Sequence, residues 1–360
     1  MPRGEHAKPH PWRPLGVSVP AVSVAVLLVA TTTEAIPLAG AAPDPAASKI
    51  AAPVQGATAL AIETAFVRVV KAVSPSVVEI STTSSLGSGV VFDTKGDIVT
   101  NAHVVGNAGQ FTVSMSNGRQ IAANLVGTYM PDDLAVIRLS SPVLGLKPAT
   151  FGNSAGLEVG DLVLAIGSPF GLAGSVTDGI VSFNGRTESE GSGVVIPDLV
   201  QTSAAINPGN SGGALVGLSG EVVGIPTMVA SNGSSAAAGV GFAVASNTVK
   251  LIAPQLISSG KVTKAGRAAL GISGTDGITF TGQAGGVIVT ATQANGPAVR
   301  AGIKVGDIIT AIDGQATLDL TSLQSVLAGM KPGARVKVAV TNQTGQKRTA
   351  TAVLGDLAQI

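Results

Sequence analysis

Two series of short apolar segments constrain the fold of this chain more than any other feature. Each series has six members rich in Val and Ile, and Gly, Asn and Asp separate them. The first comprises Val77–Ile80, Gly89–Phe92, Ile98–Thr100, Phe111–Met115, Ile121–Val126 and Leu134–Leu139. The second comprises Leu162–Ile166, Gly179–Phe183, Val194–Val200, Gly213–Val216, Val222–Ile225 and Gly239–Val244. Short strands in two such sets predict a mainly β protein with two antiparallel barrels.

The composition supports this interpretation and excludes several functions. Hydrophobic residues make up 45% of the chain but aromatic residues only 3%, so Val, Ile, Leu and Ala must build the core. The formal net charge is +1 and no basic stripe is visible, which argues against a nucleic-acid partner. The absence of cysteine excludes disulfides and thiolate nucleophiles.

Histidine is equally scarce. Only three are present, and His6 and His10 lie in a Pro-rich N-terminal tail, which leaves His103 alone in the expected folded part. This scarcity argues against a metal site built from several histidines. We expect neither a metal ion nor a cofactor.

The N-terminal region, residues 1–41, is predicted to direct export. A basic tail precedes the apolar run Val17–Ala30, and no charge occurs between Pro14 and Thr33. One interpretation is a signal peptide cleaved after the small residues Ala39–Ala41. The other is a membrane anchor, which needs roughly 20 apolar residues. Both place the folded protein outside the cytoplasm, either secreted or anchored.

The rest of the chain divides into two predicted domains. Residues 42–57 are rich in Ala and Pro and are predicted to be a linker. Helical spacing over Ala59–Ala72 and Ser246–Ser258 brackets the two strand series, which gives one domain over 58–258. Residues 259–268 are short and polar and are predicted to be a second linker. Residues 269–358 are predicted to form a separate α+β domain.

The strongest local signal is the Gly-rich run Asn207–Leu215 around Ser211. A serine hydroxyl becomes a useful nucleophile only when a base removes its proton and backbone N–H groups stabilise the resulting oxyanion. Gly209 can adopt the positive φ that such a turn needs. We expect an oxyanion hole over Gly209, Asn210 and Ser211, with the N–H groups of Gly209 and Ser211 as donors.

His103 is the available base, and it follows a predicted strand in Thr100–Val105. A carboxylate should orient its imidazole, and Asp132 and Asp133 both precede the strand that starts at Leu134. The order His, Asp, Ser, with separations of 30 and 78 residues (133−103 and 211−133), matches the two-barrel template of serine proteases. The spacing alone does not choose between the two aspartates.

These motifs together resemble the HtrA/DegP family of serine proteases. The resemblance is carried by Gly87–Val91, Thr100–Val105, Asp133–Val136, Asn207–Leu215 and Gly239–Ala243, and Pro75–Val78 is similar to the family's first strand. It extends over residues 60–355 and implies a chymotrypsin-like double antiparallel β-barrel. It implies that Asp133, and not Asp132, is the third member of a triad with His103 and Ser211. It also implies a homotrimer.

By similarity, the substrate pocket is formed by Ala205, Ile206, Asn207, Ile225, Pro226 and Thr227. None of these side chains is charged, so a small aliphatic residue before the cleaved bond is favoured over Lys or Arg. Ser203 stands where the family often has Asp, and Pro226 stands where it often has Asn. These departures concern the substrate pocket and its regulation, and they leave the triad untouched.

The C-terminal region resembles a PDZ domain, most clearly in the run Val305–Gly314. Such domains bind a peptide as an added strand and hold its C-terminal carboxylate with loop N–H groups. The corresponding loop here is Ala269, Leu270, Gly271 and Ile272, in which Ala269 replaces the family's usual Tyr. Leu323 and Leu327 lie one helical turn apart, so they either form the other wall of the groove or belong to the helix core.

The sequence therefore predicts a serine endopeptidase that hydrolyses unfolded or damaged proteins outside the cytoplasm. Its partners would be polypeptide substrates and the C-termini of peptides. The alternative is a chaperone or PDZ adaptor in which the protease domain only holds or binds other proteins. Intact His103, Asp133 and Ser211 favour the peptidase, because an inactive domain need not keep all three.

Overall fold

The computed structural model describes residues 56–83, 85–168, 175–189, 195–207, 209–232, 235–278 and 284–360. The predicted export segment 1–41 and the predicted linker up to residue 55 lie outside these ranges. Among the helices of the described residues, none is long and apolar enough to cross a lipid bilayer.

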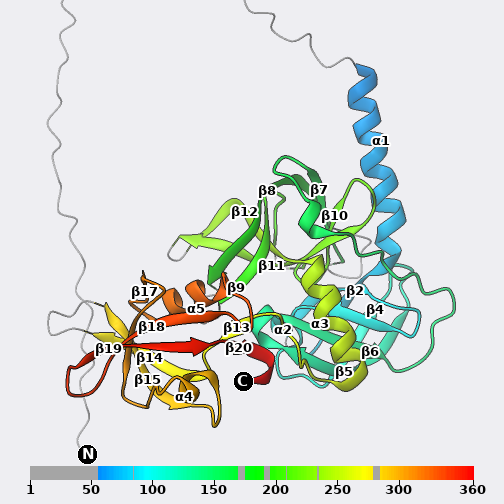
Figure 1. Ribbon diagram of the computed structural model, residues 1–360. Helices are drawn as coiled ribbons and strands as arrows, with labels where there is room; N and C mark the ends of the chain where they lie inside the picture. Colours follow the sequence, from blue (N-terminus) through cyan, green and yellow to red (C-terminus); the bar gives the residue numbers. More distant parts are fainter. Residues whose placement is uncertain are drawn as a thin grey trace, which may run out of the picture. The chain divides into compact units, whose positions relative to one another are not determined.

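The first strand series forms a closed barrel in the order β1-β2-β3-β6-β5-β4, with antiparallel neighbours throughout (Figure 1). Its strands are β1 (Val77–Ser81), β2 (Leu86–Val91), β3 (Asp97–Thr100), β4 (Gln110–Ser114), β5 (Gln120–Tyr129) and β6 (Leu134–Leu139). Two short 3₁₀ turns precede strands of this barrel: η1 (Ser74–Ser76) leads into β1, and η2 (Met130–Asp132) leads into β6.

The second series closes in the order β10-β11-β12-β9-β8-β7, drawn in green in Figure 1. Its strands are β7 (Leu162–Gly167), β8 (Ser175–Ser189), β9 (Val195–Thr202), β10 (Ala214–Gly217), β11 (Val222–Asn232) and β12 (Ser235–Ala245). Together the two barrels confirm the predicted chymotrypsin-like double barrel.

Several strands are buried on both faces, which explains why their sequences are continuous apolar runs rather than alternating ones. In β6, for example, Ala135 and Ile137 belong to the core inside the first barrel. Leu134 and Val136 belong to a different cluster, which also contains second-barrel residues such as Ile166. That second cluster packs the two barrels together, so side chains from both barrels meet in one core.

Two longer helices flank the barrels, close to where the sequence predicted them. The helix α1 (Gly56–Val73) buries Val69 and Val73 against the core shared by the barrels, while Leu60 and Ile62 nearer its start are exposed. The helix α3 (Ser246–Ser259) packs against β5, β6 and β11 and buries Ile252 and Leu256, among others (Figure 1).

The twelve predicted strands are all present, but three are much longer than the apolar pattern indicated. The largest difference is β8, which was predicted over Gly179–Phe183 and extends over Ser175–Ser189. Most of its residues are exposed or half-buried, and it pairs with β9 along most of its length. Strand structure at its ends is maintained by backbone pairing, so hydrophobic alternation cannot detect it. The same holds for the outer parts of β11 and β12, which pair with each other.

The C-terminal region forms the predicted α+β unit with its own core. Five strands of its main sheet are ordered β14-β15-β16-β18-β19, and the sixth strand, β17, pairs with β16. The strands β13 and β20 form a separate two-stranded sheet. These elements are β13 (Ala268–Ala269), β14 (Ile272–Ile278), β15 (Ala284–Thr292), α4 (Pro297–Arg300), β16 (Ile308–Ile312), β17 (Gln315–Ala316), α5 (Leu320–Ala328), β18 (Arg335–Thr341), β19 (Lys347–Val353), β20 (Gly355–Asp356) and η5 (Leu357–Gln359). In β18, buried Val336, Val338 and Val340 alternate with more exposed residues, as expected for a sheet with one covered face.

Residues 259–268, predicted to be a linker, are packed along much of their length. The side chain of Gln255 in α3 accepts hydrogen bonds from the N–H groups of Thr263 and Lys264. The carboxylate of Asp356 accepts the N–H groups of Ala265 and Gly266, and Ala265 is buried in the same core as α3. The segment is therefore held by hydrogen bonds from its own backbone to the side chains of Gln255 and Asp356.

Arg267, within the same segment, reaches the 3₁₀ turn η2. Its guanidinium forms an ion pair with Asp132 at 2.7 Å and also donates to the carbonyl oxygens of Pro131 and Val195. The Asp132 side chain is 2% exposed. Burial raises the pKa of this carboxyl, and the Arg267 guanidinium opposes that shift.

Breaking this pair is expected to destabilise the fold. Asp132→Asn leaves a largely buried guanidinium without its carboxylate, which should lower the free energy of unfolding by about 3–5 kcal/mol. The double variant Asp132→Asn with Arg267→Met removes both charges and should recover much of that loss. Urea unfolding followed by circular dichroism measures the difference. A single variant as stable as the wild type would show that the pair contributes nothing.

Candidate active site

Strand pairing in the first barrel brings His103 and Asp133 together. His103 lies in the short helix α2 (Ala102–Val105), directly after β3, and Asp133 directly precedes β6. Because Thr100 of β3 pairs with Ala135 of β6, the residues just beyond the two strand ends become neighbours. The 30-residue separation in sequence is thus closed by one antiparallel ladder.

The Asp133 carboxylate is buried and accepts three hydrogen bonds. Its Oδ2 atom lies 2.8 Å from Nδ1 of His103, and its Oδ1 accepts the backbone N–H of the same residue at 2.9 Å. The hydroxyl of Thr227 in β11 donates to Oδ2 at 2.5 Å. An imidazole held at Nδ1 in this way is fixed in orientation and presents its other nitrogen for proton transfer.

The neighbouring Asp132 points elsewhere. Asp133 has a left-handed backbone, with φ 49° and ψ 42°, a conformation that aspartate tolerates better than most residues. Its carbonyl oxygen accepts the N–H of Ala102 and the side-chain amide of Asn101. The reversal turns the Asp133 carboxylate toward His103 while Asp132 pairs with Arg267. The geometry thus distinguishes two adjacent aspartates that spacing alone could not separate.

Ser211 lies in the predicted Gly-rich turn before β10. Gly209 has φ 113° and Gly212 has φ 80°, both in the region that favours glycine. At Gly212 there is also no room for a side chain, because a Cβ atom would lie 2.3 Å from the carbonyl oxygen of Ser88. The turn therefore requires glycine at these two positions for backbone and packing reasons.

Hydrogen bonds define the shape of this turn. The Asn210 side chain accepts the N–H of Asn207 and donates to the carbonyl of Ala205, and the N–H of Asn210 itself donates to the Asn207 carbonyl. Among the described residues, the N–H groups of Gly209 and Ser211 donate no hydrogen bond. These are the two amides expected to act as oxyanion donors, whereas the N–H of Asn210 is already engaged.

His103 and Ser211 line the same cavity, which has a volume of about 350 Å³. Three of the predicted pocket residues, Ile206, Asn207 and Thr227, also line it. Sequence reasoning missed five further lining residues, Ser85, Leu86, Val104, Met228 and Val229. They lie within or beside the recognised motifs, but nothing in their residue types marks them as site residues.

The other three predicted pocket residues do not line this cavity. Ile225 is fully buried in the core. The Pro226 carbonyl accepts the N–H of Gly212, so this residue supports the nucleophile turn from β11. The Ala205 carbonyl accepts the Asn210 side-chain amide and the Thr177 hydroxyl. Pro226 and Ala205 thus support neighbouring residues of the site through their carbonyl groups.

A second cavity, also of about 350 Å³, contains all six residues predicted for peptide binding in the C-terminal unit. Ala269, Leu270, Gly271 and Ile272 lie at one side, and Leu323 and Leu327 come from α5. The carbonyls of Leu270 and Gly271 accept the N–H groups of Ala298 and Gln293, which fixes the loop. The same cavity is also lined by Leu357 and Ile360 and, from the barrels, by Met130, Pro131 and Val195.

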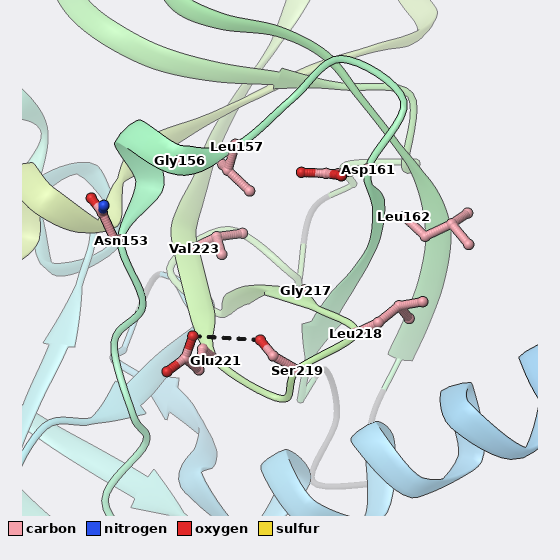
Figure 2. A pocket seen from close by; sticks show the side chains of 10 residues that line it. All are labelled: Asn153, Gly156, Leu157, Asp161, Leu162, Gly217, Leu218, Ser219, Glu221 and Val223. Atoms are coloured by element: carbon pink, nitrogen blue, oxygen red, sulfur yellow. Dashed lines mark hydrogen bonds between the residues drawn. The ribbon is translucent and has the colours of Figure 1, made fainter.

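A third cavity, of about 310 Å³, lies in the second barrel and contains none of the predicted site residues. Figure 2 shows its two carboxylates, Asp161 and Glu221, coming from different segments. Asp161 accepts the N–H of Glu158, and Glu221 is hydrogen-bonded to Ser219 within a turn. Each carboxylate is thus hydrogen-bonded within its own loop. Within the described residues, no group of His, Asp or Glu side chains is arranged to hold a metal ion.

Comparison with known proteins places both units in known families. Residues 87–225 match the trypsin-like peptidase domain, and residues 275–353 match the PDZ domain. The chain is 39% identical over 266 residues to a protein named probable periplasmic serine endoprotease DegP-like from Brucella suis, covering 71% of this chain and 49% of the relative. It is 40% identical over 260 residues to the periplasmic serine endoprotease DegP of Escherichia coli, covering 70% of this chain and 53% of the relative. The chain spans about half the length of the curated relatives it matches.

Solved structures show the same similarity over more of their length. The HtrA-type protease AlgW with a decapeptide is 31% identical, with a TM-score of 0.57, and the match covers 81% of this chain and 98% of that structure. A serine endoprotease from Yersinia pestis is 32% identical, with a TM-score of 0.55 and the same two coverages.

Proposed function

Because the chain belongs to the family of HtrA-type serine proteases, we propose that it is a serine endopeptidase with a catalytic triad of Ser211, His103 and Asp133. The observation that carries this proposal is the 2.8 Å hydrogen bond from His103 to the buried Asp133 carboxylate, at the edge of a cavity that Ser211 shares. The proposed division is a protease domain over 58–258, a connection over 259–268 and a PDZ domain over 269–358.

In the proposed reaction, the Ser211 hydroxyl attacks the carbonyl carbon of a peptide bond while Nε2 of His103 accepts its proton. The same proton then passes from His103 to the leaving amine, and water repeats the sequence on the acyl-enzyme. Asp133 holds the imidazole in the tautomer with the proton on Nδ1 and stabilises the imidazolium that forms. The N–H groups of Gly209 and Ser211 stabilise the oxyanion. Thr227 acts on the triad through its hydrogen bond to Asp133.

We propose that the substrate pocket accepts small aliphatic side chains. Apart from His103 itself, the side chains that line the catalytic cavity are uncharged, and Ile206, Met228 and Val229 contribute apolar surface. A Lys or Arg side chain would find no carboxylate there among the described residues. Unfolded or damaged polypeptides, which expose such apolar residues, are the proposed substrates.

Removing a triad member tests the central assignment. Ser211→Ala and His103→Ala should each lower kcat by roughly 10⁴–10⁶, and the double variant should be little worse than either one, because the groups act as a unit. Asp133→Asn should cost about 10⁴ near neutral pH, since an amide favours the wrong imidazole tautomer. Hydrolysis of casein measures all four. Casein cleavage that persists in Ser211→Ala, or strictly additive losses, would contradict the triad. A wild-type protein that cleaves no casein would favour the chaperone or adaptor role.

We propose that the PDZ domain binds the C-termini of polypeptides. The edge strand β14 and the helix α5 flank the apolar cavity, and the loop Ala269–Ile272 lies at its end.

We also propose a homotrimer, as the family resemblance implies. Leu60 and Val67, two helical turns apart on one face of α1, are exposed and offer an apolar surface for self-association. Light scattering would give the mass in solution, and a monomer would contradict this assembly.

A peptide with a free apolar C-terminus should bind the full chain more tightly than its C-terminal amide, because loop N–H groups prefer a charged acceptor. Leu327→Ala should weaken binding of the acid form roughly tenfold, the effect of losing about 1.5 kcal/mol of apolar contact. Val353→Ala, on the exposed side of β19, is the matched control and should bind normally. Calorimetry in a Ser211→Ala background avoids cleavage. Equal affinity for acid and amide would exclude carboxylate recognition.

We propose that the protein acts outside the cytoplasm, directed there by residues 1–41. The curated relatives are named as periplasmic proteins, which supports this location. Fractionation of cells that express a C-terminally tagged chain should find no folded cytoplasmic pool. An N-terminus near Ala42 would indicate a cleaved signal peptide, and an intact N-terminus in the membrane fraction would indicate an anchor. A full-length cytoplasmic pool would contradict export.

A further inference from the structure

Ser88 is a buried polar residue at the seam between the two barrels that the proposed mechanism does not use. It lies in β2 of the first barrel and is 0% exposed. Its hydrogen-bond partners across the seam come from the second barrel. Its hydroxyl oxygen lies 2.5 Å from the carbonyl oxygen of Gly209, and the N–H of Ser168 donates to that hydroxyl at 2.9 Å. Its own backbone N–H donates to the Ser211 carbonyl at 2.9 Å.

The direction of the Ser88 hydroxyl proton follows from these partners. The N–H of Ser168 is a donor, so the Ser88 oxygen must accept there. The Gly209 carbonyl is an acceptor, so the single hydroxyl proton must lie on that side. The resulting chain, from amide to hydroxyl to carbonyl, polarises each bond in a site without water access.

These contacts hold the peptide unit between Gly209 and Asn210 from both sides. The Ser88 hydroxyl binds its carbonyl oxygen, and the Asn207 carbonyl binds its N–H at 3.1 Å. The Ser211 carbonyl, two residues further along the chain, accepts the Ser88 backbone N–H. One residue of the first barrel therefore anchors the backbone carbonyls of both residues whose N–H groups are the proposed oxyanion donors.

Glycine at position 209 makes this anchor important. With φ 113° and no Cβ atom, Gly209 has little intrinsic preference for one backbone conformation. External hydrogen bonds must therefore fix the orientation of its peptide groups. Oxyanion stabilisation depends on donors that are already oriented before the charge develops.

We propose that Ser88 is a positioning residue for oxyanion stabilisation, and that its side-chain hydroxyl keeps the Gly209 and Ser211 amides in the geometry that the transition state requires. This inference rests on the proposed peptidase function and assigns a determinant of that function to the first barrel. Ser88 does not touch the substrate. It acts through the turn that does.

Ser88→Ala removes the hydroxyl and keeps the backbone N–H bond to Ser211. It is expected to lower kcat about tenfold to a hundredfold, less than deletion of an oxyanion donor itself, with KM changed by less than about twofold. The matched control is Ser246→Ala. Ser246 is also 0% exposed and donates its hydroxyl to a backbone carbonyl, that of Gly152, at 2.9 Å, away from the nucleophile turn. This control should keep the wild-type kcat.

A peptide aldehyde and the corresponding peptide alcohol separate a positioning role from a structural one. The aldehyde carbonyl carbon forms a bond with the Ser211 oxygen, and the hydroxyl proton passes to His103. The aldehyde oxygen becomes an oxyanion that accepts hydrogen bonds from the N–H groups of Gly209 and Ser211. The alcohol binds without forming that bond. Ser88→Ala should weaken inhibition by the aldehyde at least tenfold and leave inhibition by the alcohol unchanged. Ser246→Ala should change neither.

Wild-type kcat in Ser88→Ala, an equal loss of kcat in Ser246→Ala, or equal weakening of aldehyde and alcohol would overturn the inference. If Ser88→Ala does not fold, Ser88→Thr retains a hydroxyl, and its kcat should stay within about threefold of the wild type. A folded Ser88→Thr with a hundredfold lower kcat would equally overturn the inference. A wild-type protein that neither cleaves peptides nor binds the aldehyde would refute the proposed peptidase function, which is a separate result.

Discussion

The arrangement around the candidate site depends on the need to satisfy one buried carboxylate. Asp133 is 2% exposed, and a buried charge is tolerated only when it is fully hydrogen-bonded. Its donors come from different parts of the fold: the backbone and ring of His103 in α2, and the hydroxyl of Thr227 in β11. The carboxylate therefore joins a histidine of the first barrel to a strand of the second. Satisfying its charge also determines where the imidazole lies.

The seam between the barrels thus contributes to the chemistry as well as to stability. Apolar residues from both barrels, such as Val136 and Ile166, share one core there. At the same seam, Thr227 of the second barrel reaches the aspartate of the first. In the opposite direction, Ser88 of the first barrel reaches the nucleophile turn of the second. Each barrel supports the reactive group of the other, so a displacement of one barrel would disturb both halves of the site.

The sequence predicted those features that depend on local pattern. Runs of Val and Ile indicated twelve strands, and the Gly-rich turn and the lone histidine indicated Ser211 and His103. It could not predict features set by pairing or by distant contacts. The ends of β8 and the packing of Arg267 on Asp132 have no periodic signal. Thr227 was expected as a pocket residue, and its hydrogen bond to Asp133 joins two residues that are 94 positions apart in sequence. Ser88 lay within a recognised motif, but its residue type alone gave no role.

The central claim is that Ser211 is a nucleophile activated by His103, and covalent labelling tests it most directly. A fluorophosphonate probe reacts with serine hydroxyls that a neighbouring base activates. Digestion and peptide mapping of the labelled protein should find one modified residue, Ser211. Labelling should be lost in His103→Ala and in the urea-unfolded protein. Modification of a different serine, or labelling that persists without His103, would contradict the account.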